Sequence, residues 1–138
     1  MLDAGITTLM LRGLPPNLKR GMLLQLLSAE GAGRYNLVYV PYDKIANRPM
    51  SSAIVNFTDH ESARKVYGFF ESLRLETNWS LHIAPATVQG FEANLALIAA
   101  SSGSGFAALC EPEGPLIFVD GVTGSMIWGI SLGFRVDG

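Results

Sequence analysis

Four side chains of this sequence stand out for the chemistry that they could carry: Arg12, Tyr39, Asn56 and His82. An arginine guanidinium can pair with a phosphate or lie flat against a planar ring. Aromatic side chains stack on unpaired bases, and an asparagine carboxamide can hydrogen-bond to the edge of a base. Each of these residue types can therefore contact a nucleic acid. The alternative for each is an ordinary role, such as a strand-surface tyrosine, a solvated charge or the partner of a turn.

Four predicted strands would position these side chains. Alternating hydrophobicity predicts strands over residues 7–12, 35–41, 50–57 and 79–85. Successive side chains of a strand point to opposite faces, so one face of the sheet packs on the core and the other points outward. The outward positions are Met10, Arg12, Leu37, Tyr39, Ser52, Ile54, Asn56, His82 and Ala84. Three cations on flanking loops are further candidates for phosphate contacts, namely Arg34, Lys44 and Arg48.

Two amphipathic helices are expected between these strands. The first covers residues 18–30, and the second runs to about Ser72 from a cap at Thr58 or Asp59. The resulting order, β-α-β-β-α-β, predicts an α+β fold of the ferredoxin-like sandwich type. A third helix is expected over residues 89–100.

The predicted domain covers residues 6–101. A tail, residues 102–138, follows and begins with a linker of Gly and Ser. Within it, residues 116–119 and 126–130 are β-prone runs separated by the turn pair that begins at Asp120, which favours a hairpin.

Charge and cysteine content exclude several classes of protein. The net charge is −2, whereas a strongly basic nucleic-acid binder has a pI above about 9. The acidity lies in the tail, because residues 103–138 carry one Arg and four acids, against nine Lys or Arg and eight acids before them. A single cysteine, Cys110, cannot form an internal disulfide, which favours an intracellular location, nuclear or cytoplasmic. No apolar run approaches the roughly 18 residues of a membrane-spanning helix, so no membrane partner is expected.

Catalysis and metal binding are not expected either. Small phosphatases can use this fold with a phosphate-cradling loop, an arginine and an asparagine, but the loop after Arg12 contains two prolines, which lack the N–H donors of such a cradle. His60 and His82 have no Cys or His at metal-ligand spacing, and Cys110 has no visible base. The sequence therefore predicts no enzyme and no cofactor.

Five segments, residues 7–15, 22–27, 35–43, 53–57 and 86–95, stand in the order and spacing of a known domain. Across the predicted domain, the sequence resembles the carboxy-terminal RNA-recognition motif (RRM) of the Mei-two-like proteins, which are RNA-binding regulators of meiosis and development. The resemblance implies a sheet that binds single-stranded RNA, with the third helix as part of the domain.

The stacking aromatics that this resemblance implies are largely missing. Met10, Ser52 and Ile54 occupy sheet positions where such motifs commonly carry rings, and Pro85 stands where this family often has another. Stacking contributes about 1–3 kcal/mol per base, so affinity should fall by several powers of ten. The leading hypothesis is binding of single-stranded RNA through the outward face. The alternative is a degenerate motif with weak or no RNA binding. Its apolar face then docks a protein partner or is covered by the apolar tail, residues 116–130; the face contains Met10, Leu37, Met50 and Ile54.

Overall fold

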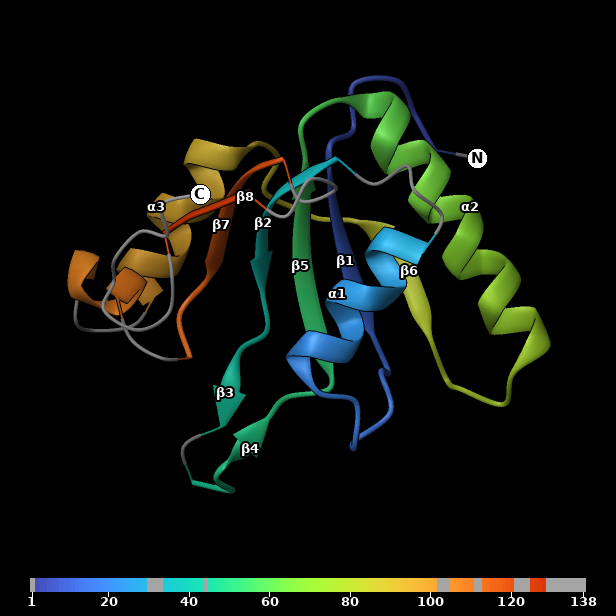
Figure 1. Cartoon of the computed structure of the whole chain (residues 1–138), viewed down its shortest axis with the longest axis horizontal. Helices are drawn as coiled ribbons and strands as arrows, with labels where there is room; N and C mark the ends of the chain where they lie inside the picture. Colours follow the sequence, from blue (N-terminus) through green and yellow to red (C-terminus); the bar gives the residue numbers. More distant parts are fainter. Residues whose placement is uncertain are drawn as a thin grey trace.

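The structure is built on one six-stranded antiparallel sheet, with the strands in the order β6-β1-β5-β2-β7-β8 (Figure 1). The computed structural model describes residues 2–29, 34–43, 45–101, 105–110, 113–120 and 125–128. The strands of the sheet are β1 (Thr8–Arg12), β2 (Tyr35–Tyr39), β5 (Ser52–Phe57), β6 (His82–Pro85), β7 (Leu116–Asp120) and β8 (Ser125–Trp128). A separate small hairpin between β2 and β5 consists of β3 (Tyr42–Asp43) and β4 (Arg48–Pro49).

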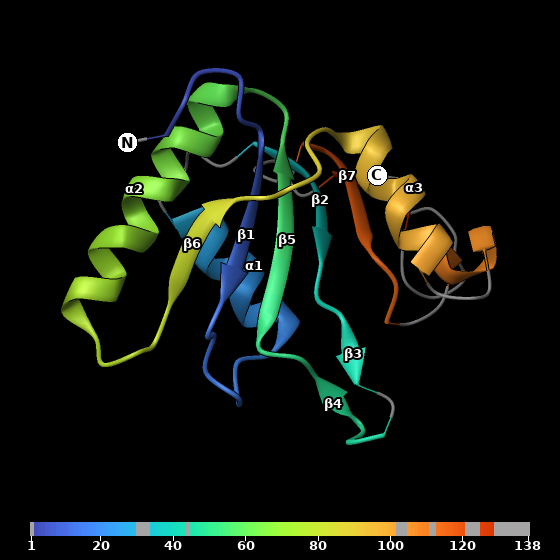
Figure 2. The same ribbon diagram turned by 180° about the vertical axis from the view of Figure 1, so that it is seen from behind.

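Two helices, α1 (Arg20–Ala29) and α2 (His60–Glu76), pack on one face of this sheet (Figure 1). Helix α3 (Phe91–Ser101) and a 3-10 helix (Gly105–Cys110) lie beside β7, on the side of the sheet opposite β6 (Figure 2). The order β1-α1-β2-β5-α2-β6 confirms the predicted ferredoxin-like α+β fold. No helix in the described part of the chain has both the length and the apolar character needed to cross a membrane.

Side-chain alternation along the central strands builds the core. Leu9 and Leu11 of β1 are each 1% exposed, and Ala53, Val55 and Phe57 of β5 are no more exposed than that. The helix residues in the same cluster include Leu23 and Leu27 of α1 and Ala63, Val66 and Phe70 of α2. Burial of one large apolar side chain contributes roughly 1.5–3 kcal/mol. The helices therefore cover one face of the sheet, and the other face is left for a different role.

Helix α2 extends about one turn beyond its predicted end at Ser72. It ends at Glu76, where Thr77 closes it: the backbone N–H and the hydroxyl of Thr77 both donate to the Leu73 carbonyl, at 3.1 and 2.9 Å. Leu73 is partly buried against the core. The apolar stripe of the helix therefore continues for about one turn beyond the predicted end.

Asp59 caps α2, as predicted, and should make the stability of the fold depend on pH. Its carboxylate accepts a hydrogen bond from the Ser62 backbone N–H at 2.8 Å, and this bond is the main cause that lowers the pKa of Asp59. A carboxyl with a lowered folded pKa stabilises the fold above its unfolded pKa, about 3.9, and loses that effect as the pH falls through the folded value. We expect Asp59→Ala to cost about 1 kcal/mol near neutral pH, and less in acid, measured by urea unfolding across a pH series.

Asp59→Asn serves as the control, because an asparagine retains an oxygen that can accept the same hydrogen bond. It should keep most of the stability near neutral pH and remove most of the pH dependence. A loss for Asp59→Ala that is the same in acid and at neutral pH would contradict the role of the charged cap.

Two strands of the tail belong to the sheet. Strand β7 pairs with β2, with Leu116 opposite Val38, and β8 is the antiparallel neighbour of β7, the hairpin that the tail sequence favours. Leu116 and Phe118 lie in the main core, and the Phe118 ring packs edge-on against Tyr35 with the ring centroids 5.2 Å apart. The tail therefore contributes to the core, and the independent folding of residues 6–101 stays a prediction.

Candidate nucleic-acid interface

The face of the sheet away from α1 and α2 is turned toward the viewer in Figure 2. The register of the strands places two rows of residues on this face. The first row crosses β2, β5, β1 and β6 through Tyr39, Ile54, Met10 and Ala84. The second row crosses β5, β1 and β6 through Ser52, Arg12 and His82. Directly opposed residues of neighbouring strands have their Cβ atoms about 4.5–5.5 Å apart. The strand residues of the predicted site, apart from Asn56, therefore share one continuous surface.

Arg12 and His82 supply the polar contacts of this surface. Both side chains are exposed and lie directly opposite each other across β1 and β6. Within the described residues, neither makes a hydrogen bond, an ion pair or a ring contact. Strands β1, β2, β5 and β6 contain no Asp or Glu, so no carboxylate on these strands competes for the guanidinium. Arg12 is thus available to a phosphate or to a planar ring.

A hollow of about 380 Å³ opens beside these two residues, along β6 and the chain that follows it. Its lining includes Met10, Arg12, His82, Ala84, Pro85 and Thr87. The Met10 thioether and the Pro85 ring supply apolar surface, and Arg12 and His82 supply charge and hydrogen-bonding groups. The hollow combines the apolar and polar contacts that an unpaired base needs.

Asn56 has a structural position, and the geometry does not support the predicted base-reading role. The residue is only 3% exposed. Its Oδ1 accepts hydrogen bonds from the hydroxyls of Thr7 and Thr8, at 3.0 and 2.6 Å, and its Nδ2 donates to Asn36 Oδ1 at 2.9 Å. Both ends of the carboxamide are therefore used inside the protein, and we leave Asn56 out of the proposed contacts.

Leu37 is also buried, so the outward face is less apolar than the sequence indicates. It is 0% exposed, although its register opposite Asn56 places it on the outward side. Ile98 and Ala99 of α3 are each 5% exposed and, like Leu37, lie outside the main core cluster. Because α3 lies beside β7 (Figure 2), this burial indicates a second, small apolar layer at this side of the sheet. The open part of the face is the opposite end, around Met10.

The three loop cations do not gather at one place. Arg34 is exposed, and its backbone carbonyl accepts from the Thr58 N–H at 2.7 Å, which places it at the end of the sheet where β5 finishes. It also helps to lower the pKa of Asp59. Arg48 is exposed at the other end, just before β5 and near the second row. Lys44 lies outside the described residues.

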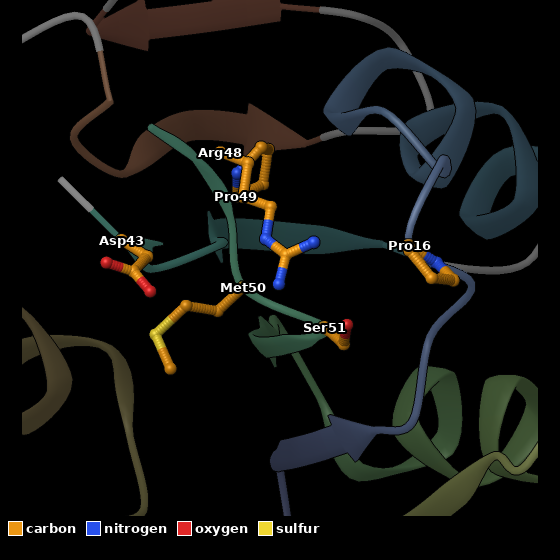
Figure 3. Close-up of a pocket in the computed structure, with 6 residues that line it drawn as sticks. All are labelled: Pro16, Asp43, Arg48, Pro49, Met50 and Ser51. Carbon is orange, nitrogen blue, oxygen red and sulfur yellow. The ribbon is translucent and has the colours of Figure 1, made fainter. Parts of the chain in front are cut away.

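Arg48 borders a hollow of about 220 Å³ between the β3–β4 hairpin and the loop after β1. The hollow is lined by Pro16, Asp43, Arg48, Pro49, Met50 and Ser51. In Figure 3 the Arg48 side chain extends toward the middle of this group, whereas the Asp43 carboxylate points away from it. That carboxylate instead accepts from the N–H groups of Ile45 and Ala46, at 3.0 and 3.1 Å, and closes the hairpin turn. Among the described residues, the Arg48 side chain makes no hydrogen bond or ion pair.

The structure also brings together three polar residues that the sequence analysis did not single out: Thr8, Gln89 and Asn94. They connect the start of β1 to the segment that leads into α3. The available signal was the Gln89-Gly90 pair, but its partner Thr8 lies 81 residues away in the chain, and no local pattern reveals such a contact. In the part of the chain that the structure describes, no group of three or more His, Cys, Asp or Glu residues could hold a metal ion.

The chain is similar to proteins with an RNA recognition motif. Residues 9–68 match the family described as RNA recognition motif, which supports RNA binding in general. No curated protein gives a significant match. Similar solved structures include the crystal structures of RNA Binding Protein PG1, at 18% identity, and of the second RRM domain of yeast Poly(U)-Binding Protein (Pub1), at 17% identity. Each alignment covers 62% of this chain and 99% of the other, with a TM-score of 0.47.

The matched segment begins inside β1 and ends inside α2, and it contains β1, α1, β2 and β5, the core of the fold described above. The strand order β6-β1-β5-β2, with two helices on one face, completes the same architecture. The chain therefore has the fold of an RNA recognition motif.

Proposed function

We propose that this chain binds single-stranded RNA through the open face of its sheet, which we define as Met10, Arg12, Tyr39, Ser52, Ile54 and His82. The observation that carries the proposal is the opposed pair Arg12 and His82. Both side chains are exposed, and neither has an internal partner among the described residues. Both groups are therefore open to a ligand, and an RNA supplies phosphates and bases for both.

The open face can hold bases without the usual rings. Met10 and Ile54 are direct neighbours at its centre. Tyr39 lies beside Ile54 in the same row, and His82 lies beside Arg12 in the second row. Contacts between a methionine sulfur and an aromatic ring contribute about 0.3–1.5 kcal/mol, less than the 1–3 kcal/mol or so per base of aromatic stacking. We therefore propose weaker binding than a fully aromatic sheet would give, with a Kd of roughly micromolar order.

Phosphate contacts are assigned to the exposed arginines. Arg12 and Arg48 lie at the open end of the sheet, and Arg34 lies at the other end. Lys44, four residues before Arg48 in the sequence, remains a fourth candidate. Each neutralised phosphate of a single strand contributes about −0.7 to the slope of log K against log salt. Two or three contacts therefore correspond to a slope of about −1.4 to −2.1.

Membership of the Mei-two-like group is a further part of the proposal. It is supported by the five sequence segments and by Gln89 and Gly90, which stand directly before α3 and make contacts with β1. An intracellular location, nuclear or cytoplasmic, is proposed on the same grounds, because RNA and a single cysteine both fit that compartment.

The alternative function is a protein-docking module. The observation that favours it is the exposed apolar side chains on the chain between β2 and β5, with Ile45 98% exposed and Met50 50% exposed. Such residues around an apolar face can form the centre of a protein interface. RNA titration separates the two functions.

Arg12→Ala should weaken RNA binding by about five- to tenfold, because it removes one charge-assisted contact of about 1 kcal/mol. Tyr39→Ala should weaken binding by at least as much, since stacking on a ring contributes about 1–3 kcal/mol. Fluorescence-anisotropy titration of the full chain with a pool of short single-stranded RNAs, at two salt concentrations, measures both effects.

Arg64→Ala is the matched control for these titrations. Arg64 lies on α2, on the helix-covered side of the sheet, and pairs with Glu61. It should leave RNA affinity unchanged. Equal losses from all three substitutions would exclude the sheet face as the RNA site, and no binding by the unaltered chain would favour the protein-docking module.

A further inference from the structure

Gln89 spans the gap between the start of β1 and the segment that leads to α3. Its Oε1 accepts from the backbone N–H groups of Thr7 and Thr8, both at 2.9 Å. Its Nε2 donates to the carbonyls of Thr8 and Ala86, at 2.9 and 2.8 Å. All four partners are backbone groups, and β6 pairs with β1 only from Leu9 onward. The Ala86 N–H also donates to the Thr8 carbonyl, at 2.9 Å. Ala86 and the Gln89 carboxamide together therefore continue the β6–β1 pairing to the beginning of β1.

The Thr8 hydroxyl fastens the same segment to the outward side of the sheet. It accepts from the Gly90 N–H at 2.8 Å and from Asn94 Nδ2 at 3.5 Å, and it donates to Asn56 Oδ1 at 2.6 Å. Asn94 is 1% exposed and also donates to the carbonyls of Val88 and Gly90. The segment before α3 is thus bonded to Thr8 in two ways. Gln89 binds the Thr8 backbone, and Gly90 and Asn94 bind the Thr8 hydroxyl.

The fastened segment closes one end of the outward face. In Figure 2 the chain between β6 and α3 crosses in front of β1 and β5. Thr8 and Asn56, to which this chain is bonded, are 0% and 3% exposed. On the same outward side of β1, Met10 is half-buried and Arg12 is exposed. The limit of the open face is therefore set by a crossing segment and not by the end of a strand.

We propose that Gln89 is a latch that holds this crossing segment in place and so sets where bound RNA must leave the sheet. The inference rests on the proposed function. When the segment is held in place, RNA contacts the row of Met10 and the row of Arg12. These rows are two residues apart along β1, which corresponds to about 6.6 Å. Such a surface holds about two or three bases. Opening the latch would uncover the next row, which contains Thr8 and Asn56, and would lengthen the site.

The experiment compares Gln89→Ala with Gln25→Ala, which removes an exposed glutamine from α1. Hydrogen exchange of the full-length protein reports on the segment and on α3. Anisotropy titration with random-sequence RNAs of about two to ten nucleotides reports on the length of the site. For the unaltered chain, we expect affinity to level off at about three nucleotides. For Gln89→Ala, exchange in residues 86–101 should accelerate by about tenfold or more, and affinity should continue to rise, by about threefold or more, at greater lengths.

A second variant protects the test against simple misfolding. Thr8→Val keeps the backbone bonds to Gln89 and removes only the hydroxyl, so it should shift the length dependence in the same direction. Because the two residues act on one segment, the change in length dependence in the double variant should be smaller than the sum of the changes in the two single variants.

The outcomes distinguish this inference from the function on which it rests. Faster exchange with an unchanged length limit, or unchanged exchange in Gln89→Ala, would overturn the latch and leave RNA binding intact. Equal loss of affinity at every length would also overturn it, since that result describes a residue with a structural role only. No RNA binding by the unaltered chain at any length would overturn the proposed function and the latch together.

Discussion

Gly13→Ala should destabilise the fold by about 3 kcal/mol or more, measured by urea unfolding. Gly13 follows β1 with a φ of +75°, and a Cβ atom added there would lie 1.9 Å from the Ser80 carbonyl oxygen and 2.8 Å from its carbon. Both atoms are backbone atoms, so no side chain can rotate to relieve the overlap. Ser80 directly precedes Leu81, which is 1% exposed in the core. The chain opposite Gly13 is therefore held in place by its own packing.

Two other glycines separate the causes of this loss. Gly68 lies in α2 with open space around an added Cβ, so Gly68→Ala should stabilise the fold by about 0.5–1 kcal/mol. Gly5 has a φ of +90° but also has open space, so Gly5→Ala should cost only the backbone strain, about 1 kcal/mol. A loss for Gly13→Ala that is no larger than that for Gly5→Ala would show that the Ser80 segment yields.

Local sequence patterns predict the strands of the sheet and the helices that pack on it, because the interactions that form these elements are local. Alternation in β1 separates Leu9 and Leu11, each 1% exposed, from Arg12, which is exposed. Asp59 caps α2 through the N–H of Ser62, three residues away. In both cases the determining groups lie within one turn or one strand, where spacing alone identifies them.

Contacts between distant segments escape such patterns. Alternation correctly places Leu37 and Asn56 on the outward side, but it does not reveal that they are 0% and 3% exposed. The groups responsible come from other parts of the chain: Gln89 joins β1 across 81 residues, and β7 pairs beside Leu37 from the tail. The sequence therefore identifies the face correctly and overestimates how much of it is open.

Asn56→Ala should lower the free energy of unfolding by about 2–3 kcal/mol. The change leaves the Thr7 and Thr8 hydroxyls without their acceptor and Asn36 Oδ1 without the Asn56 donor, and it opens a cavity at a position that is 3% exposed. Urea unfolding measures the loss. RNA titration, well below the unfolding transition, measures whether the affinity of the folded protein is retained, as we expect.

Ser52→Ala is the control for this substitution, because Ser52 lies on the same strand and the same outward side as Asn56 and its side chain makes no hydrogen bond within the described residues. It should change stability by no more than about 0.5 kcal/mol. The pair of variants then separates the two readings of Asn56. A residue that reads bases would lose RNA affinity on truncation with stability intact, whereas a residue that ties β5 to the start of β1 loses stability first. Reduced affinity in a fully stable Asn56→Ala protein would return Asn56 to the RNA site and would mean that the crossing segment opens when RNA binds.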